Sequence, residues 1–145
     1  MDRIVTAMLC GILVVGSGAV VCAGETTRRS VDSAGSEGNN PSNEPAISAN
    51  GRFVAFESDA TNLVAGDTNG AIDIFVHDRA TGQTTRVSVD SGGYQGNGSS
   101  RNPAISDRGR FVAFESFATN LVAGDTNGIR DIFVHDRTTG QTTRV

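Results

Sequence analysis

Beyond the N-terminal segment, hydrophobic positions come in short runs separated by Gly, Asn, Asp and Ser. In residues 52–58, Phe53 and Ala55 lie on one side of an extended chain, and Val54 and Phe56 lie on the other. Both sides are therefore apolar, which predicts an inner strand covered on both faces. No stretch keeps a helical period, so we expect little helix outside the N-terminal segment.

Four segments of this kind are predicted to be strands, at about 45–48, 52–58, 73–79 and 84–90. Segment 73–79 is apolar on both sides, like 52–58. Segment 84–90 alternates Thr and Val with polar residues, so one of its faces is polar. We therefore expect it to be the outermost strand of an antiparallel sheet.

The four-strand unit occurs twice. Residues 26–87 align without a gap with residues 84–145, and 45–48 return as 103–106, a period of 58 (103 − 45). Most paired positions are identical, which marks an internal repeat. Such a unit does not bury its apolar faces alone, so we expect the units to stack. The predicted fold class is all-β, with two four-stranded antiparallel β-propeller blades that form a partial propeller.

The N-terminal residues 1–23 predict a secretory signal peptide, because a slightly positive start is followed by an apolar run and small residues at the cleavage point. An uncleaved membrane anchor is the alternative. Cys10 and Cys22 both lie in this segment, so its removal leaves no thiol. We expect an exported protein that is periplasmic, secreted or on the cell surface, with no membrane contact beyond the signal peptide.

These features divide the chain into five parts. They are the signal peptide at 1–23, a linker with a copy of the outer strand at 24–44, the first blade at 45–90, a linker at 91–102 and the second blade at 103–145.

The repeated motifs also suggest a family. Residues 45–58 read Pro-Ala-Ile-Ser-x-x-Gly-Arg-Phe-Val-Ala-Phe-Glu-Ser, and residues 67–82 read Asp-Thr-Asn-Gly-x-x-Asp-Ile-Phe-Val-His-Asp-Arg-x-Thr-Gly. This pattern resembles the TolB-type, WD-like β-propeller repeat of exported bacterial proteins, over nearly all of residues 26–145. The resemblance implies propeller blades and, by analogy, binding of a protein or peptide.

Two blades do not close a ring, because propellers have about 4–8. Two stacked sheets also leave two outward faces with Phe and Val side chains. We therefore expect either a fragment of a longer protein or a protomer completed by further blades from other copies.

Composition narrows the function. The net charge is −4, and all 12 basic residues are arginines without a basic patch, so we expect no nucleic-acid partner. The leading hypothesis is an exported, non-catalytic propeller module that binds a protein or peptide, or serves as a scaffold. The alternatives are a calcium-binding structural repeat of a surface protein and the propeller fragment of an exported hydrolase.

The one candidate metal site is an Asp-x-Asn-Gly-x-x-Asp loop in each repeat. Alternating oxygens beside a glycine at a tight bend are typical of Ca²⁺ loops. The candidate ligands are Asp67, Asn69 and Asp73, and in the second repeat Asp125, Asn127 and Asp131. The alternative is a structural turn at Asn-Gly, with the first Asp capping backbone amides and the last Asp starting a strand.

Other polar residues are predicted to be structural. His77 and His135 recur in both units as satisfied polar groups at strand ends, and Glu57 is expected to contact Arg52. Tyr94 is the one tyrosine and stands in a polar connection, where it is either a recognition contact or the result of sequence drift.

Overall fold

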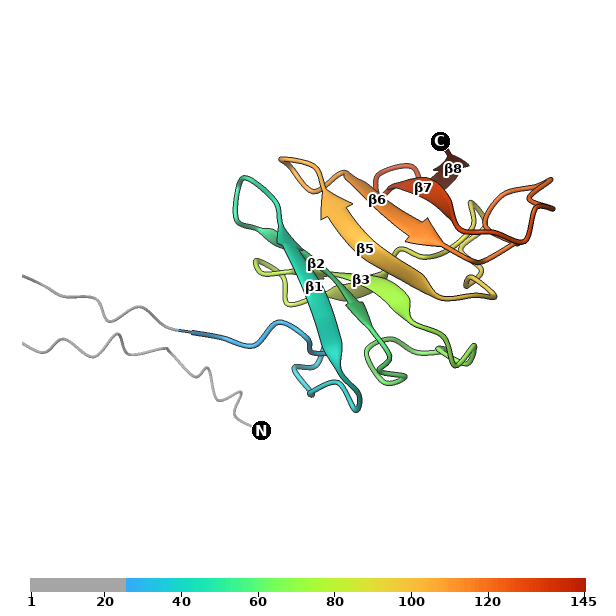
Figure 1. The fold of residues 1–145 in the computed structure, drawn as a ribbon. Coiled ribbons are helices and arrows are strands. Elements are labelled where there is room, and N and C mark those ends of the chain that lie inside the picture. Colours follow the sequence, from blue (N-terminus) through green and yellow to red (C-terminus); the bar gives the residue numbers. More distant parts are fainter. Residues whose placement is uncertain (1–25) are drawn as a thin grey trace, which may run out of the picture.

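The computed structural model describes residues 26–145, which form two four-stranded antiparallel sheets in tandem (Figure 1). Blade 1 has the order β1 (Ser42–Ile47), β2 (Phe53–Ser58), β3 (Asp73–Asp78) and β4 (Thr84–Arg86). Blade 2 has the order β5 (Ser100–Ile105), β6 (Phe111–Ser116), β7 (Asp131–Asp136) and β8 (Gln141–Arg144). The predicted fold class is confirmed. The signal-peptide prediction and both cysteines lie outside the described residues.

Residues 26–145 hold no helix, and so no helix there has the length and hydropathy needed to cross a membrane. Each blade is a simple meander, because strands that are neighbours in the sequence are also neighbours in the sheet. A short turn joins β1 to β2 and β3 to β4, and a longer loop, residues 59–72, joins β2 to β3. The β1–β2 turn needs Gly51, which has a φ of 69° and donates its N–H to Ser48 O at 2.8 Å.

The first strand of each blade begins earlier than predicted. Ser42 and Asn43 pair with Ser58 and Glu57 of β2, and the register then shifts before Ala46. Glu44 has a φ of 48° at this bulge, and Asn102 has a φ of 54° at the same place in blade 2. The bulge lets the strand continue past a residue that cannot pair, which is why the hydrophobic pattern alone placed the start at 45.

The outermost strand differs more from its prediction. β4 ends at Arg86, four residues before the predicted 90, and its polar side is not solvated. Ser88 is fully buried, and its hydroxyl donates to Asp73 Oδ1 at 2.6 Å. The alternation of polar residues in this segment therefore reflects buried hydrogen bonds to β3. Val87 still donates its N–H to Ile74 O of β3 at 2.8 Å, and the chain then crosses toward blade 2.

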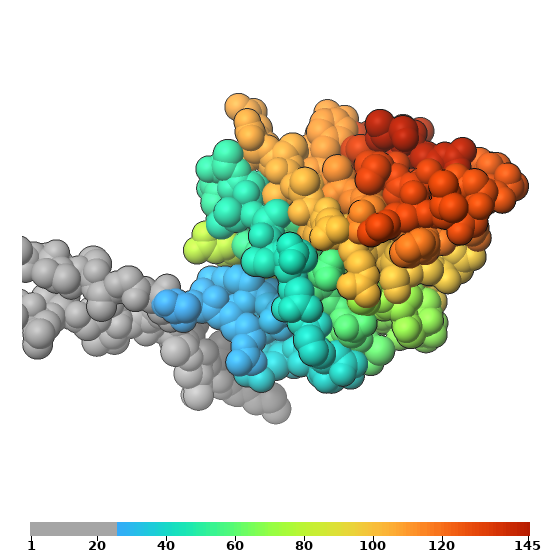
Figure 2. Space-filling model, viewed as in Figure 1, coloured from blue at the N-terminus to red at the C-terminus, as the bar shows by residue number. Residues whose placement is uncertain are grey.

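The two sheets stack face to face, with β5 next to β1, β2 and β3 (Figure 1). The shared core joins buried residues of one side of blade 1 to buried residues of the facing side of blade 2, namely Ala55, Ile74, Val76, Val112, Phe114 and Phe133. Figure 2 shows the two blades in close contact, with the orange and red blade 2 forming one end of the molecule. The stacking predicted from the repeat is thus present.

The other side of blade 1 has a second core. Phe56 and Phe75 stack with their ring centroids 5.9 Å apart and pack with Ala60 and Leu63. The N-terminal segment covers them, because a Cβ added at Gly38 would lie 3.2 Å from Ala60 Cβ. Glycine at this position allows the segment to lie close to the sheet.

Candidate functional site

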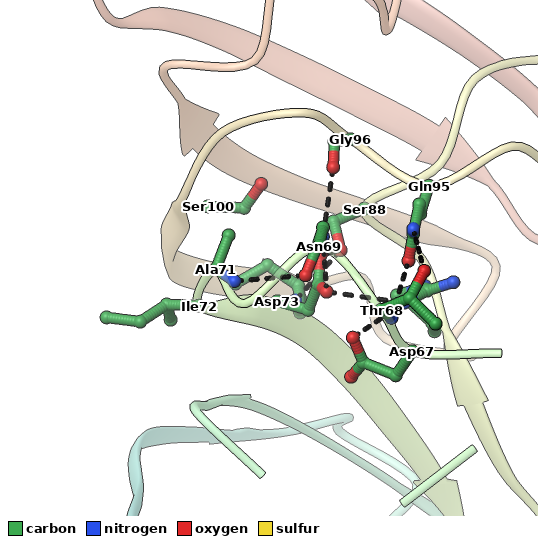
Figure 3. A network of polar contacts seen from close by, with 12 residues as sticks. Asp67, Thr68, Asn69, Ala71, Ile72, Asp73, Ser88, Gln95, Gly96 and Ser100 are labelled. Carbon is green, nitrogen blue, oxygen red and sulfur yellow. Dashed lines mark hydrogen bonds and ion pairs between the residues drawn. The ribbon is translucent and has the colours of Figure 1, made fainter. Parts of the chain in front are cut away.

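The predicted metal-binding loop lies at the start of β3 and is part of a polar network (Figure 3). Gly70 has a φ of 63°, and Asn69 Oδ1 accepts the N–H of Ala71 at 3.0 Å. The amide nitrogen of Asn69 donates to Asp73 Oδ2 and to Gly96 O, each at 2.9 Å. Asn69 thus closes the turn and links it to the segment that leads into blade 2.

Arg86 of β4 lies between the two acids of this loop. Its Nη1 is 3.2 Å from Asp67 Oδ1 and 3.3 Å from Asp73 Oδ2, and all three side chains are nearly buried. Burial raises the pKa of Asp67, the neighbouring Asp73 charge raises it further, and Arg86 opposes both effects. One guanidinium therefore compensates two buried carboxylates.

Blade 2 repeats this arrangement in a more open form. Arg144 Nη1 lies 3.1 Å from Asp125 Oδ1 and 3.3 Å from Asp131 Oδ2. Asn127 Nδ2 donates to Asp131 Oδ2 at 3.0 Å. The Arg144 side chain is 34% exposed, compared with 10% for Arg86, because no further sheet covers this side.

These contacts fit a structural turn better than a cation site. The Arg86 guanidinium already occupies the space between the two carboxylates, and the amide oxygen of Asn69 already accepts the backbone N–H of Ala71. Within residues 26–145, His, Cys, Asp and Glu side chains do not gather in groups of three or more that could hold a metal. The calcium hypothesis stays a prediction, which a thermal melt with and without Ca²⁺ tests.

Two details of the turn differ from the sequence-based alternative. Asp73 does begin a strand, but Asp67 forms an ion pair instead of capping backbone amides. Sequence reasoning missed Arg86, because its partners lie in another part of the unit. The one available signal was the Thr-Thr-Arg triplet, which recurs at the same point of each repeat.

The two histidines belong to the blade scaffold. His77 is 2% exposed, and its Nδ1 lies 2.9 Å from Thr84 Oγ1. That hydroxyl in turn donates to Val31 O at 2.6 Å, which ties the N-terminal segment to the blade. His135 contacts Thr142 Oγ1 at the same distance of 2.9 Å. Burial is the main cause that lowers the pKa of both imidazoles, which favours their neutral form.

Glu57, the acidic residue of β2, takes a different partner from the expected Arg52. Arg52 pairs with Asp78 through two hydrogen bonds of 2.9 and 2.7 Å, which hold the Asp78 pKa well below its usual range. Glu57 instead accepts the N–H of Asn102 from blade 2 at 3.0 Å and lies 3.7 Å from Arg101. Glu57 is therefore an inter-blade contact.

Each blade also has a hollow at the corresponding place, between the turn near residue 33 and the loop after the second strand. The blade 1 hollow has a volume of about 580 Å³ and the blade 2 hollow about 270 Å³. Equivalent residues line both, among them Asp32 and Asp90, Leu63 and Leu121, and Ala65 and Ala123.

Tyr94 lies beside the blade 2 hollow. Its side chain is 72% exposed, and a Cβ added at Gly92, which lines this hollow, would lie 3.2 Å from the ring. Blade 1 has Ser36 at the equivalent position. The two hollows therefore differ in size and in one exposed aromatic side chain.

The two sheets are β-propeller blades. This assignment rests on their strand order and stacking. No family model and no curated protein matches the chain. A solved structure described as a TolB from Agrobacterium tumefaciens matches with a TM-score of 0.49 and 19% identity, over 72% of this chain and 30% of that one.

The crystal structure of TolB from Acinetobacter baumannii matches with a TM-score of 0.45 and 22% identity, over 72% of this chain and 21% of that one. The chain spans less than a third of the length of either structure. At this identity the likeness concerns the fold alone.

Proposed function

We propose that the chain is an exported, non-catalytic propeller module that binds a protein or peptide through the loops around its two hollows. The observation that carries this proposal is the duplicated hollow with Tyr94 at the edge of its second copy. Binding sites are often loops held by a rigid scaffold. An exposed tyrosine offers a large contact area with one hydrogen-bonding group, which suits recognition of a peptide.

The other polar groups support a binding role over a catalytic one. In both blades the buried histidine contacts a threonine hydroxyl, and the Asp–Arg contacts at the third strand lie within one blade. Side chains that form such contacts stabilise the blades. The lining of the hollows mixes apolar side chains such as Leu63 with polar ones such as Thr61, and the one acid of the ion pair that lines the blade 1 hollow, Asp67, is already paired with Arg86.

Selection of random displayed peptides on the purified protein tests the proposal. Ala65 and Ala123 line the two hollows, so the double variant Ala65→Trp, Ala123→Trp fills both. We expect this double variant to lower the affinity for a selected peptide by about tenfold or more. Tyr94→Ser, which introduces the residue of blade 1, is expected to weaken binding to a similar degree.

The matched control is Ala80→Trp, which places the same large side chain on the exposed β3–β4 turn, away from the hollows. It is expected to leave the affinity unchanged. Failure to select any peptide, or a selected peptide whose affinity none of the hollow variants alters, would contradict the proposal.

A further inference from the structure

The contact between the blades is made by two complementary faces. The front face of a blade consists, in blade 1, of Phe53, Ala55, Ile74 and Val76. The rear face consists, in blade 2, of Val112, Phe114, Ala118, Leu121 and Phe133. In the structure the front face of blade 1 is covered by the rear face of blade 2.

The front face of blade 2 carries the same side chains and is open. Its members are Phe111, Ala113, Ile132 and Val134, which are identical to those of blade 1. Ile132 is 48% exposed and Phe111 is 43% exposed, whereas Ile74 is fully buried. A cleft of about 150 Å³ between Ala104, Ala113 and Ile132 marks this surface.

The rear face of blade 1 is the matching half. Its Val54, Phe56, Ala60, Leu63 and Phe75 are identical to the rear face of blade 2. Four of these five side chains are already buried, and the exposed part of the face lies at Val54, which is half-buried, and at its strand partner Ile47, which is 60% exposed. The equivalent Val112 of blade 2 is fully buried. A cleft of about 180 Å³ lined by Pro45, Val54 and Phe56 lies here.

We propose that the open front face of blade 2 binds the exposed part of the rear face of blade 1, around Ile47 and Val54, of a second copy of this chain, in the geometry of the contact between the two blades. This inference rests on the proposed function, since it names a partner of the same propeller module. A second copy is the expected partner, because the two faces that meet between the blades recur, with identical apolar side chains, on the two outer sides of the molecule.

A glycine socket makes the fit specific. The ring of Phe53 lies against Gly109, where an added Cβ would be 2.1 Å from Cδ2 of the ring. Gly51 is the equivalent glycine of blade 1, and an added Cβ there meets Arg79 Nη1 at 3.7 Å, with no ring against it. Phe111 of one copy would therefore enter the socket at Gly51 of the next.

An arginine closes the same socket. Phe53 lies between two guanidinium groups, with Arg52 Cζ 4.9 Å and Arg137 Cζ 4.5 Å from its ring centroid. Phe111 has one such contact, with Arg110 Cζ at 4.7 Å. Arg79, the counterpart of Arg137, already donates to Gly51 O as Arg137 donates to Gly109 O. It is therefore placed to supply the second contact.

Two of the polar contacts between the blades can recur in this interface. Asn50 N donates to Asp107 O between the blades at 3.2 Å, a backbone contact that any residue at the equivalent position can make. Glu57 accepts the N–H of Asn102, and Glu44 has the same left-handed conformation as Asn102, so its N–H can serve Glu115 of another copy. Asn43 stands in place of Arg101, so that ion pair is not repeated.

Such an interface is heterologous, since different faces meet, and it produces rings when the rotation closes. Each copy contributes two sheets, and propellers close with about 4–8 blades, so rings of about two to four copies are expected. The chain's own β8 already pairs with β7 at the rim of blade 2. The second copy therefore adds a covering face and no strand to this sheet.

Sedimentation velocity of the purified protein from about 1 to 100 µM tests the inference. The expected result is a concentration-dependent species of two to four copies. Phe111→Asp on the front face and Ile47→Asp on the rear face each abolish growth beyond a single copy, and an equimolar mixture of the two variants forms dimers and nothing larger. Circular dichroism checks that these variants of exposed residues remain folded.

Phe117→Asp is the matched control. Phe117 is 50% exposed on the same blade, but its counterpart Asp59 remains exposed with blade 2 in place, so it lies outside the front face. A protein that stays monomeric at about 100 µM overturns the inference, as does dissociation by Phe117→Asp equal to that by Phe111→Asp. Loss of assembly in Phe111→Asp alone, with Ile47→Asp unaffected, indicates that two front faces meet and also overturns it.

The outcomes are separable from those of the proposed function. The hollows and Tyr94 lie outside the residues changed here, so peptide binding that persists in Phe111→Asp with assembly lost leaves the first proposal standing. Assembly of the protein when no peptide can be selected would contradict the proposed peptide binding and leave the proposed assembly standing.

Discussion

Strands β3 and β7 have the same sequence, Asp-Ile-Phe-Val-His-Asp, and very different surroundings. All six residues of β3 are buried, whereas in β7 buried residues alternate with more exposed ones. Ile74 is fully buried and Ile132 is 48% exposed. Identical local sequence therefore gives the same strand and register in both blades, and the neighbouring sheet decides which side chains belong to a core.

The same contrast applies to the charged groups. Arg86 and its two acids are nearly buried in blade 1, whereas in blade 2 Arg144 is 34% and Asp131 is 21% exposed, and Asp125 alone stays buried. A buried charge without its partner is much more costly than an exposed one. Matched substitutions in the two blades therefore measure what the covering sheet contributes.

The largest difference is expected for the arginines. Arg86→Met leaves Asp67 and Asp73 buried without a cation, and we expect it to lower the free energy of unfolding by about 3–5 kcal/mol. Arg144→Met leaves only Asp125 buried without a cation, because Asp131 stays partly exposed, and it should cost less, about 1–3 kcal/mol. Urea unfolding followed by circular dichroism, at a concentration where the protein is a single copy, measures both. Equal costs would contradict the contrast.

The next difference concerns Ile74 and Ile132. Ile74→Ala removes a fully buried side chain from the core between the blades and should cost about 2–5 kcal/mol. Ile132→Ala removes a half-exposed one and should cost about 1 kcal/mol or less. The same unfolding experiment compares them, and a cost at Ile132 that equals the cost at Ile74 would show that another element covers the front face of blade 2.

A smaller difference is expected between two glycines with similar backbone conformation. Gly109 and Gly51 have φ values of 75° and 69°, so the left-handed backbone conformation destabilises an alanine equally at both positions. At Gly109 the added Cβ also collides with the ring of Phe53. Gly109→Ala should therefore be less stable than Gly51→Ala by about 1–3 kcal/mol in the single-copy protein. Indistinguishable melting temperatures would argue against the socket.

The smallest effect is that of pH. Burial lowers the pKa of His77 and His135 in the folded state, so the unfolded chain binds more protons once the pH falls below the ordinary value of about 6.5. The stability that their neutral state provides is complete above that pH and is lost below it. The urea midpoint should fall from about pH 7.5 to pH 5.5, and less so in the double variant His77→Gln, His135→Gln.

A midpoint that falls equally in this variant would assign the effect to other groups. Asp78 and Asp136 are poor candidates for it. Their pKa values are lowered by Arg52 and Arg110, so their contribution is present above the usual aspartate value and declines only in stronger acid.

The repeat and its two-sided apolar strands were enough to predict the blades. Phe53 with Ala55 and Val54 with Phe56 form two apolar sides, which requires a covering layer on each side, and the 58-residue period supplies one layer. The turns at Asn-Gly were also predictable, because they depend on neighbouring residues. These features are local, or follow from a simple tandem order.

The contacts that cross the fold were not predictable. Arg86 meets Asp67 and Asp73 only because β4 returns beside β3, and Glu57 meets Asn102 only because blade 2 is rotated onto blade 1. The bulge at Glu44 was hidden because a left-handed glutamate has no clear signature in the sequence. The short β4 was overestimated because buried polar side chains imitate a solvated face.

The most direct test of the stacked arrangement is hydroxyl-radical footprinting of β3 and β7 in a dilute solution of the protein. The two strands share one sequence, so their intrinsic reactivity is equal and only their burial differs, while the flanking residues distinguish the peptides. The account predicts that oxidation of the peptide with Ile132 is several times faster than that of the peptide with Ile74. Equal rates in the two strands would contradict it.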